Sequence, residues 1–184
     1  PLLPLIEQQA AQADSTRSVD STVIKAIKQT DLIRMSATCN IGGVEASISA
    51  MARELEAVAG CCASTAWCLW NHLCVFHLIC AQLGPANIET LKSIVASREW
   101  VSFPAGAGTN VHGRVEGEQV TLTGRASFAS GARYGDWAAC LFALEPEHGQ
   151  RGEKPDIRFT VVRIDAPGVS VDPTWFSMGL GAWS

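Results

Sequence analysis

The chain lacks an excess of positive charge, a paired-cysteine motif and a recognisable leader. Its 184 residues carry 14 Lys and Arg against 18 Asp and Glu, which gives a formal net charge of −4 and a pI near 5.5. This balance provides no basic field for a polyanion, so we expect no nucleic-acid partner. The cysteines number seven, an odd count, and none form a C-x-x-C pair. We therefore expect reduced thiols in a cytoplasmic protein and no metal site.

Charged side chains are also missing from a long internal stretch. No Asp, Glu, Lys or Arg occurs between Glu56 and Glu89, and residues 61–84 read CCASTAWCLWNHLCVFHLICAQLG. A helix that is apolar all round is buried on every side, and about 20 such residues would also suit a membrane span. Polar Asn71 and His72 in its middle, the missing Lys/Arg flanks and the lack of a second apolar span argue against lipid. The stretch predicts the central helix of a soluble domain, with no membrane partner.

The remaining pattern is helical first and strand-like afterwards. Periodic apolar residues predict helices over 2–13, over a segment capped by Ser18 or Asp20, and over 45–58, 61–84 and 88–96. Ile48, Met51, Leu55 and Val58 are spaced for one buried face. From Trp100 onward, short alternating runs predict strands at 100–103, 119–123, 137–144 and 157–164, with a hairpin turn near 115–119. Segregated elements of this kind predict an α+β fold with an antiparallel sheet, divided into an all-α domain over 1–98 and a β-domain over 99–184.

Two glycine-containing stretches could carry chemistry. In Phe103-Pro-Ala-Gly-Ala-Gly-Thr-Asn110, backbone N–H groups leaving a strand could approach an anion, although an ordinary surface loop explains the pattern as well. In Gly124-Arg-Ala-Ser-Phe-Ala-Ser-Gly131, small residues around one aromatic could form a flat floor under a ring system, with the Ser130 hydroxyl against its heteroatoms. A plain strand and turn is the competing interpretation of that stretch.

The central stretch carries two histidines, His72 and His77, five residues apart. Residues five apart on a helix point in different directions, so the pair cannot bind a metal as residues four apart do. A single histidine on an apolar helix is usually a hydrogen-bonded core residue. If it lines a cavity instead, a neutral imidazole can act as acid, base or hydrogen-bond donor near pH 7.

Taken in order, four motifs resemble those of a known superfamily. They are Cys62-Ala-Ser-Thr-Ala-Trp67, Phe103-Pro-Ala-Gly-Ala-Gly-Thr-Asn110, Gly124-Arg-Ala-Ser-Phe-Ala-Ser-Gly131 with Asp136-Trp137, and Trp175-Phe-Ser-Met-Gly-Leu180. Together they resemble the acyl-CoA dehydrogenase superfamily. Within it the chain is most similar to the flavin-dependent monooxygenases that form the oxygenase component of two-component systems.

The resemblance implies a fold and a set of ligands. It implies an N-terminal helical domain, a barrel-like middle β-domain and a C-terminal four-helix bundle that mediates a homotetramer and is missing from this chain. It further implies reduced FMN or FAD delivered by a separate flavin reductase, O2 as co-substrate, and a small aromatic or heteroaromatic substrate to be hydroxylated or oxygenated.

The resemblance also implies roles for individual residues. The flavin-contacting strand corresponds to Trp100, Ser102 and Phe103, and the loop near the cofactor phosphate to Gly108, Thr109 and Asn110. The flavin ring would lie against Phe128 and Ala129, with Ser130 near its N5 atom as a catalytic hydroxyl. The position of an active-site histidine corresponds to His72, which with Trp67 and Asn71 would line the substrate cavity.

Two other functions stay open. An acyl-CoA dehydrogenase would need a Glu base, which in the family lies beyond this chain. A non-catalytic flavin-binding fragment is the other. Phe103-Pro104 stands where dehydrogenases have Thr-Glu, and Gly131 where they have Asn. Within this resemblance, the Phe-Ala-Ser-Gly version at 128–131 suits an oxygenase better.

Overall fold

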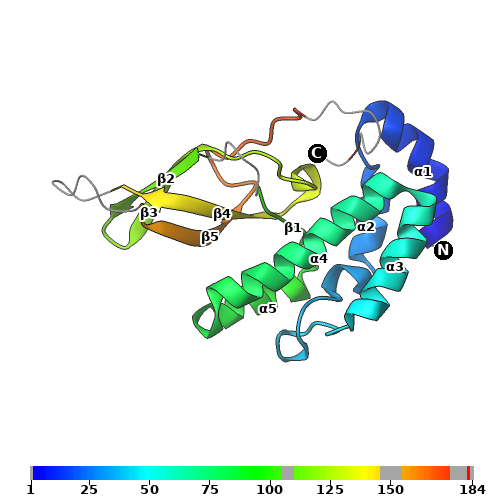
Figure 1. The fold of residues 1–184 in the computed structure, drawn as a ribbon, viewed down its shortest axis with the longest axis horizontal. Coiled ribbons are helices and arrows are strands. Elements are labelled where there is room, and N and C mark those ends of the chain that lie inside the picture. Colours follow the sequence, from blue (N-terminus) through cyan, green and yellow to red (C-terminus); the bar gives the residue numbers. More distant parts are fainter. Residues whose placement is uncertain (1, 105–109, 146–154, 175–181, 183–184) are drawn as a thin grey trace.

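The computed structural model describes residues 2–104, 110–145, 155–174 and 182. Figure 1 shows the helices gathered at one end of the molecule and the strands extending away from them. The described elements are α1 (Leu2–Thr16), α2 (Ser21–Lys28), α3 (Ile48–Cys61), α4 (Ala63–Leu83), α5 (Ile88–Ala96), β1 (Val101–Ser102), β2 (Asn110–Glu116), β3 (Gln119–Arg125), β4 (Trp137–Leu144) and β5 (Ile157–Arg163). This order confirms the α+β class. The division into domains at 98/99 stays a prediction.

Local signals in the sequence place the helix starts. Asp20 caps α2 by accepting a hydrogen bond from the Thr22 N–H at 2.7 Å. Of the two predicted caps, Ser18 and Asp20, the structure thus confirms Asp20. The α3 helix begins only after Ser47, whose side chain accepts from the Ala50 N–H. Ile48 is thus the first helical residue and is 82% exposed, so its assignment to the buried face is wrong. That face starts at the half-buried Met51.

The α4 helix is the core element, but only on one side. Ten of its 21 residues are buried, and it contacts α1, α3, β1 and β5. Its opposite face, with Trp70, Cys74, His77 and Ala81, is exposed. The prediction that α4 is buried on every side is therefore wrong for the described chain, because these neighbours all pack against the other face.

One helix in the described part of the chain, α4, is long and apolar enough to cross a membrane by length and composition. Nearly half of its residues are buried against the rest of the fold, and the core helix of a soluble protein passes the same test. Its hydropathy is therefore weak support for a membrane span.

The sheet is mixed, whereas the sequence pattern predicted an antiparallel one. The hairpin β2–β3 and the pair β4–β5 are antiparallel, but β4 runs parallel to both β1 and β2. The chain crosses over after β3, through residues 126–136, before it enters β4, and this crossover makes the two parallel pairings possible. The β2 strand was not predicted, because its sequence Asn-Val-His-Gly-Arg-Val-Glu is mostly polar.

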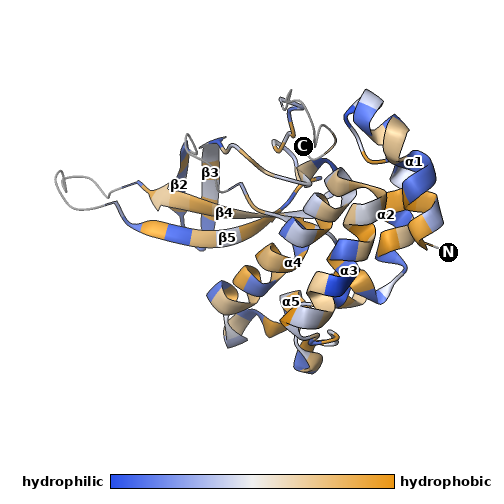
Figure 2. Cartoon of the chain, turned by 45° about the vertical axis from the view of Figure 1, so that its right-hand side comes forward, coloured by the Kyte–Doolittle hydropathy of each residue, from blue (hydrophilic) through white to orange (hydrophobic). Residues whose placement is uncertain are grey.

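The sheet is open in the part of the chain that the structure describes. The strands β1, β3 and β5 each have a single partner among the described strands, and no pairing joins β3 to β5. Figure 2 shows that β5 carries hydrophobic stretches interrupted by hydrophilic residues, and most of its residues are only half-buried. Closure into a barrel and the C-terminal bundle stay predictions.

A tight loop after α2 gives a test of this fold. The segment 44–46 returns along 34–37, with the Glu45 N–H donating to the Ala37 oxygen at 2.8 Å. A Cβ on Gly43 would lie 2.0 Å from that same oxygen, whereas one on Gly60 in α3 would meet nothing within 4 Å.

We expect Gly43→Ala to lower the free energy of unfolding by about 1–3 kcal/mol, because the backbone must shift to accept the methyl group. Gly60→Ala should instead raise it by up to about 1 kcal/mol, because alanine is the better helix former. Urea unfolding of both variants measures this. Equal effects in the two variants would contradict the loop geometry.

Candidate functional site

The strand β4 is left partly unpaired on one side, and a cavity opens there. Along that side, β1 pairs with β4 up to Ala138 and β2 pairs with it from Ala143 onward. Between them the described residues offer β4 no strand partner. A cavity of about 730 Å³ adjoins this gap, lined by Ala138, Ala139 and Cys140 of β4 together with β3 and the segments 126–130 and 168–174. This volume lies within the range of roughly 300–1,000 Å³ typical of small-molecule sites.

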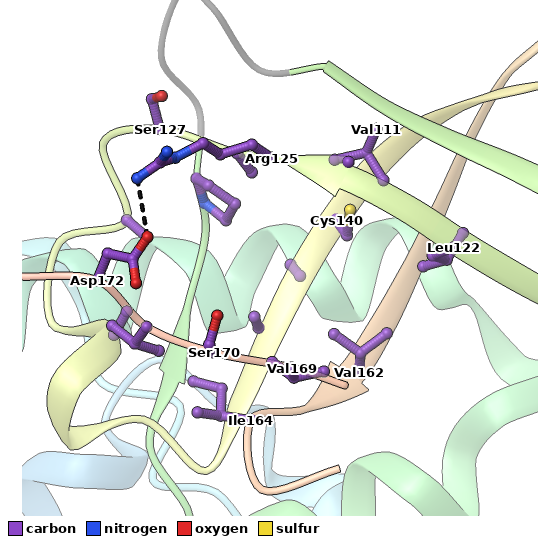
Figure 3. A pocket seen from close by; sticks show the side chains of 18 of the residues that line it. Val111, Leu122, Arg125, Ser127, Cys140, Val162, Ile164, Val169, Ser170 and Asp172 are labelled. Atoms are coloured by element: carbon purple, nitrogen blue, oxygen red, sulfur yellow. Dashed lines mark hydrogen bonds and ion pairs between the residues drawn. The ribbon is translucent and has the colours of Figure 1, made fainter. Parts of the chain in front are cut away.

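Small side chains form much of the cavity wall. Alanines come to it from the crossover segment and from β4, with Val111, Leu122 and Val162 adding apolar surface (Figure 3). Phe128 lines the cavity with φ +62° and is 60% exposed. A bulky residue rarely adopts this left-handed conformation. The turn that presents its ring is therefore held by its surroundings, not by its own preference.

Ser130 lines the cavity and is held from α4. The indole N–H of Trp67 donates to the Ser130 hydroxyl oxygen at 3.3 Å. An indole N–H can only donate, so the Ser130 oxygen accepts here and its own proton remains available to another acceptor. Asn71 donates back along α4 to the Trp67 carbonyl oxygen at 3.0 Å. The structure thus brings the predicted residue Trp67 to Ser130, while neither Trp67 nor Asn71 is among the residues that line the cavity.

The predicted flavin-contacting strand is placed differently. Trp100 and Ser102 are fully buried, and Phe103 packs against Phe159 with ring centroids 6.3 Å apart. None of the three lines the cavity, which begins at Pro104. Of the three, Trp100 lies nearest to the cavity wall, since a Cβ added to Gly131, the neighbour of Ser130, would lie 3.1 Å from the Trp100 indole nitrogen. Gly108 and Thr109 lie outside the described residues.

His72 is separate from the cavity. It is 1% exposed, its Nε2 lies 2.6 Å from the Ile33 carbonyl oxygen, and its Nδ1 accepts from the Val101 N–H at 3.0 Å. These partners fix a neutral ring with its proton on Nε2. Burial lowers the pKa of His72 to about 4. Both nitrogens are thus engaged by backbone groups, so the predicted catalytic and substrate-binding roles do not fit and His72 is a structural residue. His77 lies on the exposed face of α4.

Sequence reasoning missed the cavity's two charged residues. Arg125 and Asp172 are the charged side chains among the described residues that line it, and their ion pair spans 2.8 Å at its edge (Figure 3). Arg125 stands inside the Gly124–Gly131 stretch, so the sequence pattern could have identified it as a site residue. Asp172 lies in a segment with no regular hydrophobic period, and no sequence pattern pointed to it. No group of three or more His, Cys, Asp or Glu among the described residues is placed to hold a metal ion.

Comparison with solved structures decides the fold. XiaF from Streptomyces sp., in complex with FADH2 and glycerol, superimposes with a TM-score of 0.84 at 20% identity, over 98% of this chain and 43% of that one. The dibenzothiophene monooxygenase TdsC from Paenibacillus sp. A11-2, in complex with FMN and indole, gives 0.85 at 16% identity, over 99% and 47%. The chain thus shares an acyl-CoA dehydrogenase-like fold with these proteins.

A curated relative of this chain is the oxygenase component of p-hydroxyphenylacetate 3-hydroxylase from Acinetobacter baumannii. The two are 28% identical over 146 residues, which is 77% of this chain and 32% of that protein. No protein-family model matches the chain. The chain spans about a third of the length of this relative and less than half of the structures named above.

The lining of the cavity is of the kind that accommodates a planar cofactor. Its walls of small and apolar side chains suit a flat ring system, and the Ser130 hydroxyl can meet a ring heteroatom. Polar groups are few and lie at defined places, which is the usual construction of a cofactor site. Phe128, Ala129 and Ser130 are the predicted cofactor residues that the cavity brings together.

The buried imidazole gives a pH test. The folded-state pKa of His72, about 4, lies below its ordinary value of 6.5, so the unfolded chain binds more protons between these values. Stability is therefore full above pH 6.5 and falls as the pH drops toward 4, by about 3 kcal/mol in total. His72→Gln should be less stable than wild type at pH 7.5 and should lack this contribution. Denaturant unfolding at pH 7.5 and pH 4.5 measures the difference between the two proteins. A difference that does not shrink at pH 4.5 would contradict the buried neutral state.

Proposed function

We propose that this chain forms part of a flavin-dependent monooxygenase that uses reduced FMN or FAD and O2 to oxygenate a small aromatic or heteroaromatic substrate. The observation that carries the proposal is the cavity beside the unpaired part of β4, walled by residues 126–130, in a fold shared with proteins bound to FADH2 and FMN. Delivery of reduced flavin by a separate reductase, a homotetramer and a cytoplasmic location belong to the same proposal.

The bound flavin would supply two electrons to O2, so that one oxygen atom enters the substrate and the other leaves as water. The chain's own residues would orient the ring and keep water away. Phe128 and Ala129 present apolar surface beside it, and the alanines of β4 allow its close approach. Exclusion of water matters because it suppresses side reactions of reactive intermediates.

Ser130 has the most specific task in this proposal. Because Trp67 donates to its oxygen, the Ser130 proton is directed to an acceptor in the cavity, and we assign it to a flavin heteroatom near the site of oxygen transfer. Trp67, which donates to Ser130, and Asn71, one turn further along α4, are half-buried and would border the substrate. His72 is not part of this arrangement.

We expect Ser130→Ala to divert the reaction from substrate oxygenation to hydrogen peroxide release. The ratio of oxygenated product to hydrogen peroxide should fall about tenfold, the worth of one hydrogen bond of roughly 1.4 kcal/mol. The full-length protein is given reduced FMN in air, with indole and p-hydroxyphenylacetate as probe substrates. Ser93→Ala, an exposed position on α5, is the matched control.

An unchanged ratio in Ser130→Ala would remove Ser130 from the mechanism. Absence of any oxygenated product, together with bleaching of bound oxidised flavin by an acyl-CoA, would replace the oxygenase with an acyl-CoA dehydrogenase. The two results are read in separate assays, so they can be told apart.

A further inference from the structure

The cavity has one cation among the described residues that line it. Arg125 ends β3 at the cavity edge and pairs with Asp172 through its Nη2 atom at 2.8 Å (Figure 3). The rest of that lining is apolar or carries hydroxyl groups. A ligand with an anionic end can therefore find a full positive charge at this one place on the cavity wall.

The Arg125–Asp172 ion pair is exposed, so another anion can replace Asp172 on Arg125. The side chains of Arg125 and Asp172 are 70% and 60% exposed. Ion pairs at such exposed positions contribute roughly 0–1 kcal/mol, because water solvates both partners well when they separate. An incoming phosphate monoester carries roughly 1.5–2 negative charges at pH 7 and can take two parallel hydrogen bonds from a guanidinium. A phosphate can thus replace the Asp172 carboxylate on Arg125 at little cost.

The backbone around Arg125 is held in place. Gly124 has φ +143°, and a Cβ there would lie 2.0 Å from the Asn110 carbonyl oxygen, so the two chains approach as closely as glycine permits. Arg125 is the register partner of Asn110 across the β2–β3 hairpin. Asn110 is also the described residue of the loop expected near a cofactor phosphate. The close approach therefore presents Arg125 beside that loop from a defined position.

We propose that Arg125 binds the phosphate of the flavin, and that Asp172 occupies the guanidinium until the flavin arrives. This inference rests on the proposed function and adds to it the residue that recognises the anionic end of the cofactor.

The test compares three flavins that share the ring system. Riboflavin lacks a phosphate, FMN carries a monoester and FAD a diphosphate, so the ratio of their dissociation constants isolates the anionic end. Affinities are measured by flavin fluorescence on the full-length protein as wild type, Arg125→Gln, Asp172→Asn and Arg114→Gln. Arg114 is a matched control, because it is equally exposed at 70% and does not line the cavity.

Arg125→Gln should raise the dissociation constant of FMN about tenfold or more, because the charge-assisted hydrogen bonds to the phosphate are lost. The dissociation constant of riboflavin, which has no phosphate, should change by less than about twofold. Asp172→Asn should lower the dissociation constant of FMN by up to about fivefold, because the competing carboxylate is removed. Arg114→Gln should change the dissociation constant of neither FMN nor riboflavin. The same data show which phosphate group Arg125 binds. Tighter binding of FMN than of FAD would identify a phosphate monoester, and tighter binding of FAD would identify a diphosphate.

If Arg125→Gln lost affinity for FMN and riboflavin equally, or lost affinity for neither, the assignment of Arg125 to the phosphate would be overturned, while the flavin site itself would stand. Failure of the wild-type protein to bind any of the three flavins would overturn the proposed function together with the assignment. The riboflavin measurement therefore separates the two failures.

Discussion

The neutral imidazole of His72 holds the helices to the sheet. From α4 it donates to the Ile33 carbonyl oxygen and accepts from the Val101 N–H at the start of β1, and its ring lies 5.1 Å from that of Trp100. A buried backbone N–H must find an acceptor, and among the described residues the acceptor for the Val101 N–H is His72 Nδ1 and not a neighbouring strand. The geometry works only with the uncharged ring, since a proton on Nδ1 would face the donor. Burial of His72 keeps its ring uncharged, and the uncharged ring holds the start of β1 in place.

The position of β1 in turn creates the cavity. The Asp136 carboxylate accepts from the Trp100 N–H and from Lys28, which fixes the entry to β4 beside β1. From there β1 stops at Ser102 and β2 rejoins β4 only at Ala143, so the middle of β4 stays open on that side. Small residues at this place leave room for a ligand, whereas longer side chains would fill the gap. The site is therefore a consequence of sheet topology as much as of its lining.

Sequence reasoning succeeded where the signal was local. The Asp20 cap and the strand at 137–144 follow from capping chemistry and spacing, and the structure confirms both, while the strand predicted at 157–164 runs over Ile157–Arg163. The cavity wall at 126–130 was predicted from its small residues and from the family resemblance. Ile48, the exposed face of α4 and the parallel partners of β4 were missed, because they depend on which elements pack together. The role of His72 was missed for the same reason, since its partners are 39 and 29 residues away.

The central claim is that the cavity beside β4 is the flavin site, and a cavity-filling variant tests it most directly. Ala138→Phe places a ring where the flavin would lie, with Ala96→Phe at the exposed end of α5 as control. Calorimetric titration with FMN should show binding to wild type and to Ala96→Phe, and a loss of about 100-fold or more in Ala138→Phe with its unfolding transition retained. Binding of FMN to a folded Ala138→Phe with unchanged affinity would contradict the account.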